Sequence, residues 1–284
     1  MAKKMQRKHI FFFSKTTWFI LFWCLLAIGF YLWIFVEPYT LWSPDIARPN
    51  ATLSQLHFDK PYHVYFKAYE KKTGKVWPED IYRKSTSGAL QKIHPVDIDA
   101  VDFVFSNQLQ QLVLLGWGKA TITNPAGITL KTVVFPSGLH YENDSFLMDA
   151  WGVSIILGLH PNGSYLKTES YVLQLVDQTI TPSAVPLPQK DYSKRPYLKS
   201  PDGKYTVHID KSGSVFIDGK EYIHSAGRDR GWKQANIIGC FEPQWFSDSN
   251  HVLLTCAGDQ LRILEVSTHK QAIFANGFSQ QIAQ

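Results

Sequence analysis

The sequence of 284 residues is poor in cysteine and lacks the common catalytic motifs. It holds three cysteines, and no two of them form a C-x-x-C pair. A G-x-S-x-G nucleophile elbow, an H-E-x-x-H zinc motif and a G-x-x-x-x-G-K-[ST] phosphate loop are also missing. We therefore expect no catalytic residues and no cofactor, and the sequence favours a binding protein over an enzyme.

Acidic residues are absent before position 37, whereas five basic residues precede position 16: Lys3, Lys4, Arg7, Lys8 and Lys15. The chain has 29 basic and 24 acidic residues, so the remaining 24 bases equal the acids and the net charge of +5 belongs to the N-terminus. A nucleic-acid-binding protein needs a positive face to displace counterions. We therefore predict no nucleic-acid partner.

Residues Trp18 to Val36 form an uncharged, mostly apolar run of nineteen residues. A helix of that length spans ~28 Å, close to the thickness of the hydrocarbon layer of a membrane. The run predicts a single transmembrane anchor over residues 17–36. A cleaved signal peptide is the alternative, because Ala27-Ile28-Gly29 offers small residues, but the apolar run continues past that point.

The basic charges before the anchor predict its orientation. By the positive-inside rule, residues 1–16 stay in the cytoplasm and the rest of the chain crosses the membrane. Residues 37–51 contain three prolines and are expected to form a stalk, and residues 52–284 form the exported domain. We expect an inner-membrane protein with a periplasmic C-terminal domain and a protein or envelope component as its partner.

The exported part has the pattern of an all-β protein. Asp218-Gly219 suits a two-residue hairpin turn between Val215-Phe216-Ile217 and Glu221-Tyr222-Ile223. Only Glu79 to Gln91 suggests a short helix. Five further runs of β-branched and apolar residues predict strands, at 63–66, 112–115, 132–135, 153–157 and 171–176.

A turn motif with serine repeats along the chain. Ser106, Ser200 and Ser247 each end one apolar run and precede another, and the intervals between them are 94 and 47 residues. Since 94 is twice 47, a missing copy is expected near residue 153. A period in the forties with four short strands in each unit is typical of propeller blades, which must stack to bury their faces.

Two of these turns resemble a known repeat. Ser200-Pro201-Asp202-Gly203-Lys204 and Trp245-Phe246-Ser247-Asp248-Ser249-Asn250 are similar to the W-S-P-D-G turn of TolB-type and WD40-like β-propellers. The resemblance covers residues 196–276 and implies that each turn joins the first two strands of a blade. It also implies strands at 244–246, 252–256, 261–266 and 271–275. We therefore expect four or five propeller-like blades, although no unit carries a Trp-Asp pair.

A proline-rich connector interrupts the repeats. Residues 181–201 contain five of the 15 prolines, which remove backbone donors and stiffen the chain. The connector is either a loop between blades or the link between two β domains, and we favour the former.

The best predicted binding surface is a basic loop after the hairpin. It combines guanidinium groups with an indole, which suit a carboxylate, a phosphate or a sugar ring, at Arg228, Arg230, Trp232 and Lys233. Cys240 and Cys256 lie on a predicted pair of strands, either as a disulfide or as two small buried side chains.

A second functional hypothesis uses Asp97 and Asp99. A D-x-D sequence behind a single anchor is typical of metal-dependent glycosyltransferases of the type II membrane class, in which the carboxylates bind a divalent ion. Such enzymes need alternating strands and helices, and this chain has few helical patterns. The histidines show no paired spacing for a metal, and we expect no metal site: His57, His63, His94, His140, His160, His208, His224, His251 and His269.

An uncleaved anchor makes a simple prediction. The purified protein should keep its own N-terminus, because the apolar run extends beyond the small residues at 27–29. N-terminal sequencing of protein extracted from membranes checks this. A mature chain beginning at Phe30 would show that a signal peptide is removed.

Overall fold

The computed structural model describes residues 48–69, 79–93, 100–162, 167–187, 197–225, 239–257 and 260–283, together with 23, 24 and 26. The chain divides into two compact units, residues 1–44 and 45–284. The predicted anchor lies outside the described residues apart from Trp23, Cys24 and Leu26. Within the described part of the chain, no helix has the length and apolar character needed to cross a membrane.

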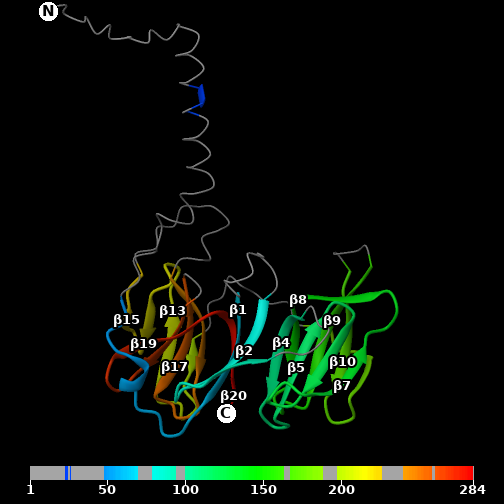
Figure 1. The fold of residues 1–284 in the computed structure, drawn as a ribbon, viewed down its shortest axis with the longest axis horizontal. Helices are drawn as coiled ribbons and strands as arrows, with labels where there is room; N and C mark the ends of the chain where they lie inside the picture. Colours follow the sequence, from blue (N-terminus) through cyan, green and yellow to red (C-terminus); the bar gives the residue numbers. More distant parts are fainter. Residues whose placement is uncertain are drawn as a thin grey trace, which may run out of the picture. The chain divides into compact units, whose positions relative to one another are not determined.

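Residues 45–284 fold into five antiparallel sheets of four strands each (Figure 1). Sheet 1 is β20 (Phe278–Ala283), β1 (His63–Tyr69), β2 (Glu79–Ser85) and β3 (Leu90–Ile93). Sheet 2 is β4 (Ala100–Ser106), β5 (Gln111–Gly116), β6 (Lys119–Thr123) and β7 (Thr129–Val134). Sheet 3 is β8 (Leu139–Met148), β9 (Ser154–Pro161), β10 (Glu169–Gln174) and β11 (Thr179–Pro182).

The C-terminal part contributes two more sheets. Sheet 4 is β12 (Leu198–Lys199), β13 (Thr206–Ile209), β14 (Val215–Ile217) and β15 (Lys220–Ile223). Sheet 5 is β16 (Cys240–Trp245), β17 (His251–Cys256), β18 (Gln260–Glu265) and β19 (Lys270–Asn276). A three-residue 3-10 helix, η2 (Leu53–Gln55), precedes sheet 1. The all-β prediction is therefore confirmed.

The ends of the predicted strands lie within four residues of the observed ends, but the predicted helix over 79–91 is wrong. That segment forms β2 and β3, which pair with each other and with β1. Ile81 and Ile93 face each other across this pair and are both buried. The local sequence does not show that β1 and β3 lie on either side of β2, and these neighbours decide that the segment is a strand.

Each sheet packs against its neighbours through apolar side chains that alternate along the strands. In sheet 2, Phe103 and Leu114 belong to a core shared with sheet 1, whereas Val104 and Val113 belong to a core shared with sheet 3. In sheet 5, Val252 packs toward sheet 4, and the next residue, Leu253, packs toward sheet 1. Since successive side chains point to opposite faces, a strand with both faces covered is apolar throughout.

Four hydrophobic cores arrange the sheets in one row, in the order 4–5–1–2–3. The burial patterns agree with this order. All of β17 and nearly all of β5 are buried, whereas β13 and β10 alternate or are mostly half-buried. In the described residues no core joins sheets 3 and 4, whose strands β11 and β12 flank the proline-rich connector. Each of these two end sheets therefore has one face without a neighbouring sheet.

The 47-residue period matches real contacts between sheets. The indole Nε1 of Trp245 donates a hydrogen bond of 2.9 Å to the carbonyl of Leu198, which lies 47 positions earlier. The backbone N–H of Asp202 donates to Ser249 Oγ at 3.0 Å, again 47 positions away. The missing copy lies at the turn between β8 and β9, where Asp149 accepts hydrogen bonds from the Val153 N–H and the Ser154 hydroxyl.

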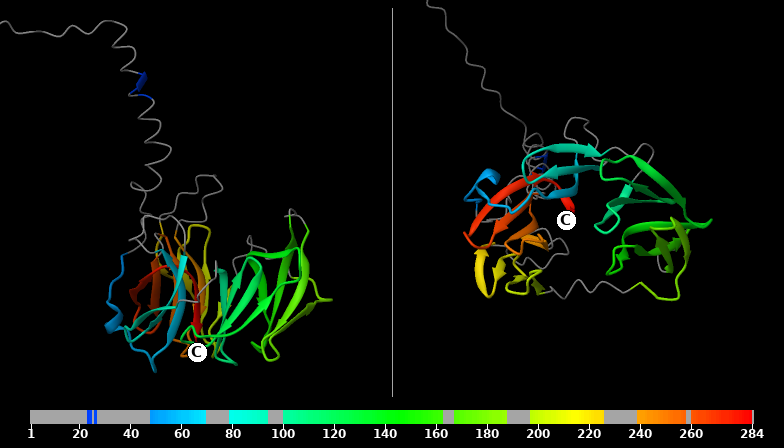
Figure 2. Two further views of the ribbon diagram at one scale, coloured as in Figure 1. Left: turned by 45° about the vertical axis from the view of Figure 1, so that its right-hand side comes forward. Right: turned by 90° about the horizontal axis from the view of Figure 1, so that it is seen from below.

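The chain closes its first sheet with its last strand. β20 pairs antiparallel with β1 over residues 63–67 and 278–283, so sheet 1 combines both ends of the described domain. Figure 2 shows this sheet with red and blue strands together, whereas each other sheet is one continuous stretch of colour. Gly277 precedes β20 and allows a close approach, because an added Cβ would lie 2.5 Å from the Lys67 carbonyl oxygen.

The predicted pair of cysteines lies within the core of sheets 4 and 5. Cys240 and Cys256 face each other across β16 and β17 and form a disulfide with an S–S distance of 2.05 Å. Both side chains are also buried in the shared core. Cys240 and Cys256 therefore form a disulfide and also belong to the buried core.

A buried cluster of charged groups fastens residues 50–62 to sheet 5. His251 Nδ1 lies 2.6 Å from Asp248 Oδ2, and its Nε2 lies 3.5 Å from Glu265 Oε1. Glu265 also accepts the backbone N–H of His57 at 3.0 Å, and the ring of Phe58 stacks on His251 with 4.0 Å between centroids. The segment that leads into β1 is therefore held by one carboxylate and one imidazole.

Hydrogen bonds determine the pKa values of the two acids in this cluster. Burial alone raises the pKa of Asp248, but hydrogen bonds from the His251 ring and from two backbone N–H groups outweigh it and leave the pKa lowered. Burial likewise raises the pKa of Glu265, and the Thr268 hydroxyl, the His57 N–H and nearby imidazoles lower it overall. Both carboxylates are thus favoured in their charged forms.

These lowered pKa values predict acid sensitivity. A carboxyl group whose folded pKa lies below its unfolded pKa adds stability above the unfolded value, about 4, and loses it as the pH falls toward the folded value. Glu265→Gln should lower the free energy of unfolding at pH 7 by about 2 kcal/mol and flatten its decline between pH 5 and 3. Urea denaturation across this range measures both effects. Glu221→Gln, in an exposed pair with His224, is the control and should change neither.

A close backbone approach between sheets 4 and 5 gives a second prediction. Gly239 has a φ of +96°, and an added Cβ would lie 2.4 Å from the Gly213 Cα. Gly203 also has a positive φ, +75°, but an added Cβ there meets no atom within 4 Å. Gly239→Ala should destabilise the protein by about 3 kcal/mol, against about 1 kcal/mol for Gly203→Ala. Equal losses in thermal or urea denaturation would mean that the approach does not constrain the fold.

Candidate ligand-binding pocket

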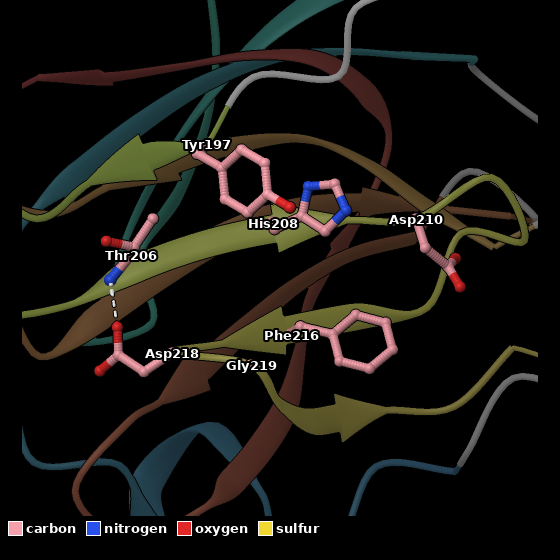
Figure 3. Close-up of a pocket in the computed structure, with 7 residues that line it drawn as sticks. All are labelled: Tyr197, Thr206, His208, Asp210, Phe216, Asp218 and Gly219. Atoms are coloured by element: carbon pink, nitrogen blue, oxygen red, sulfur yellow. Dashed lines mark hydrogen bonds between the residues drawn. The ribbon is translucent and has the colours of Figure 1, made fainter.

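The face of sheet 4 without a neighbouring sheet carries a pocket of about 520 Å³ (Figure 3). The alternation of β13 and β14 explains its lining. Val207 and Ile217 point into the core with sheet 5, so His208 and Phe216 point to the opposite face. The pocket is lined by Tyr197, Thr206, His208, Asp210, Phe216, Asp218 and Gly219.

Aromatic rings form the floor of the pocket. The ring of Tyr197 stacks on His208, with centroids 4.3 Å apart and an angle of 11° between planes, and Phe216 lies 6.5 Å from His208. Tyr197 is 70% exposed although it is a large aromatic residue. In Figure 3 its ring lies beside the imidazole, and no other labelled residue covers it. Such a surface can stack on a planar group or a sugar ring.

Two carboxylates border these rings, and backbone hydrogen bonds fix both. Asp218 Oδ1 accepts the N–H of Thr206 at 2.9 Å, as the dashed line in Figure 3 shows. Asp210 Oδ1 accepts the N–H groups of Ser212 and Ser214, each at 2.9 Å. The Asp218-Gly219 turn has φ values of +49° and +78°, as the predicted hairpin requires. These acids are held at the rim of the pocket by the turns of sheet 4.

The free face of sheet 3 differs because its own chain covers part of it. After β11, the N–H of Leu187 donates to Ser170 Oγ at 3.1 Å. An added Cβ on Gly158 would lie 3.2 Å from a methyl group of Leu187, so that side chain covers β9. Sheet 4 has no such cover among the described residues. The pocket forms on the face that is left open.

The sequence did not reveal this pocket. The only trace of the pocket in the sequence is that His208 and Phe216 alternate with aliphatic residues along two strands. The sequence does not show that sheet 4 lies at the end of the row, where this face has no neighbouring sheet among the described residues. The predicted binding residues Arg228, Arg230, Trp232 and Lys233 lie outside the described part of the chain, as do Asp97 and Asp99. The described residues thus leave both sequence-based sites as predictions.

The fold brings two of the scattered histidines together, which their spacing in the sequence does not show. His140 and His160 are direct partners across β8 and β9, and their rings lie 6.0 Å apart. Both contact Glu142, at 3.2 Å and 3.9 Å. Twenty residues separate the two histidines in sequence, so only the strand register could have revealed the pair.

Comparisons with known proteins give only distant similarities of structure. No known family and no curated protein matches the sequence. A TolB candidate from Agrobacterium tumefaciens is 14% identical, with a TM-score of 0.31, 76% of this chain covered and 70% of the other. A 6-phosphogluconolactonase candidate from Bacteroides fragilis is 9% identical, with a TM-score of 0.38 and coverages of 80% and 99%. A member of the DUF4221 family from Bacteroides vulgatus is 12% identical, with a TM-score of 0.33 and coverages of 75% and 81%.

Proposed function

We propose that residues 52–284 form a propeller-like binding module of five blades, which residues 17–36 tether to a bacterial inner membrane. The module binds a protein or envelope component in the periplasm and carries out no chemistry of its own. The observation that supports this most directly is the open aromatic face of sheet 4, with its pocket of about 520 Å³.

The sheet arrangement supports the propeller interpretation. Five four-stranded sheets follow one another at a spacing close to the 47-residue period, and the last strand completes the first sheet. Stacked blades of this kind bury both faces only when each has two neighbours. Among the described residues, sheets 3 and 4 each share a core with one other sheet only, so the module is a row of blades with two free end faces.

The pocket chemistry supports binding. A site that binds a ligand typically combines apolar and aromatic walls with a few fixed polar groups, in a volume of roughly 300–1,000 Å³. The rings of Tyr197 and Phe216 supply the aromatic wall. The carboxylates of Asp210 and Asp218, which backbone hydrogen bonds hold in place, supply the fixed polar groups. The strand-only content of sheets 1 to 5 also favours a binding module over the glycosyltransferase hypothesis, which needs alternating strands and helices.

The proposal is tested by site-specific photo-crosslinking in native membranes. A photoreactive phenylalanine analogue replaces Phe216, and in a matched control it replaces Ile273, which is 42% exposed on sheet 5. We expect a discrete adduct from position 216 only. The adduct should weaken at least tenfold when Tyr197→Ala is added, because the ring that stacks on the partner is then lost.

Two results would contradict the proposal. The same adducts from positions 216 and 273 would show that sheet 4 is no more a binding surface than sheet 5. An adduct from position 216 that Tyr197→Ala leaves unchanged, in protein with an unaltered circular dichroism spectrum, would show that the aromatic pocket does not hold the partner.

A further inference from the structure

The free face of sheet 3 carries three side chains that could share one metal ion. Tyr141 and Leu159 point into the core with sheet 2, so His140, Glu142 and His160 point to the opposite face. His140 and His160 stand opposite each other, and Glu142 follows two residues after His140 on the same strand. The side chain of Leu187 covers this face beside them, at Gly158, two residues before His160.

The hydrogen bonds of His140 leave one ring nitrogen directed at a carboxylate. Its Nδ1 lies 3.2 Å from Asn162 Oδ1, and its Nε2 lies 3.2 Å from Glu142 Oε1. With Nδ1–H donating to the amide oxygen, Nε2 is the ring atom left to bind a cation beside the carboxylate. Metal-binding histidines commonly have their second nitrogen fixed in this way.

His160 adds a second imidazole to the same carboxylate. Its Nε2 lies 3.9 Å from Glu142 Oε2, and its buried Nδ1 has no hydrogen-bond partner. His140 and His160 are only 2% and 7% exposed, so neither is simply solvated. Trp117, in the turn between β5 and β6, stacks on His140 with 4.1 Å between centroids.

Each imidazole lies near one oxygen of the same carboxylate. With Zn–N and Zn–O bonds of about 2.0–2.1 Å, two ligand atoms of a tetrahedral site lie about 3.3 Å apart. His140 Nε2 lies 3.2 Å from Glu142 Oε1, close to this value, whereas His160 Nε2 lies 3.9 Å from the other oxygen, Oε2. Among the described residues, no three histidine, cysteine or acidic side chains already have the geometry of a metal site. Glu142 is 28% exposed at its side chain and can rotate toward His160.

We propose that His140, His160 and Glu142 bind one Zn²⁺ ion on the free face of sheet 3. The ion neutralises the carboxylate and uses both Nε2 lone pairs, while Asn162 holds the His140 ring. Three protein ligands leave a fourth tetrahedral position that a water molecule can take, as in zinc sites with an open position. The site is separate from the aromatic pocket and does not depend on its function.

The test uses the full chain, without an affinity tag, in detergent and stripped of metal with a chelator. Titration calorimetry with Zn²⁺ should show one site per chain. His160→Gln and Glu142→Gln should each weaken binding at least tenfold. His224→Gln is the matched control, because His224 and Glu221 form an exposed histidine–carboxylate pair at 2.8 Å. This control should leave the affinity unchanged.

A second measurement does not depend on the variants folding. Wild-type protein loaded with Co²⁺ should show the intense visible absorption of a tetrahedral site, and Zn²⁺ should abolish it. The proposal is overturned if the wild-type protein shows no Zn²⁺ binding and no Co²⁺ absorption. It is equally overturned if folded His160→Gln binds as tightly as the wild type, or if His224→Gln weakens binding as much as His160→Gln.

Discussion

The structure depends on one constraint, namely that a four-stranded sheet with two apolar faces needs a neighbour on each face. Side chains alternate along each strand, so the inner sheets 5, 1 and 2 pack apolar residues into a core on either side. Full burial of one large aliphatic side chain stabilises the fold by about 1.5–3 kcal/mol. The cores on both faces therefore hold the row together, and the end sheets differ from the inner ones for the same reason.

The end sheets are where the chain departs from the apolar pattern. On sheet 4 the free face has a tyrosine, a histidine and a phenylalanine in place of aliphatic residues, and on sheet 3 it has two histidines and a glutamate. A connector segment covers part of sheet 3 through Leu187, whereas no described segment covers the pocket face of sheet 4. Both candidate binding surfaces arise because residues on these faces are free from packing against another sheet.

Much of the fold could be predicted from the sequence because it is encoded locally. The hairpin at Asp218-Gly219 depends on two residues that tolerate positive φ, and the repeat depends on turns that recur every 47 residues. The candidate sites depend on long-range pairing. His140 and His160 meet only through the register of β8 and β9, and Tyr197 meets His208 only through the pairing of β12 with β13. The helix expected over 79–91 failed for the same reason, since β1 and β3 decide the conformation of β2.

The pairing of β20 with β1 has a consequence for biosynthesis. Sheet 1, whose strands β1 to β3 are made before those of the other sheets, stays one strand short until residues 278–283 have been made. During that interval the free edge of β1 and the apolar residues beside it have no native partner, which favours association with other chains. A nascent chain thus needs protection until β20 has been made, and a stop codon just before residue 278 would damage the sheet that is made first.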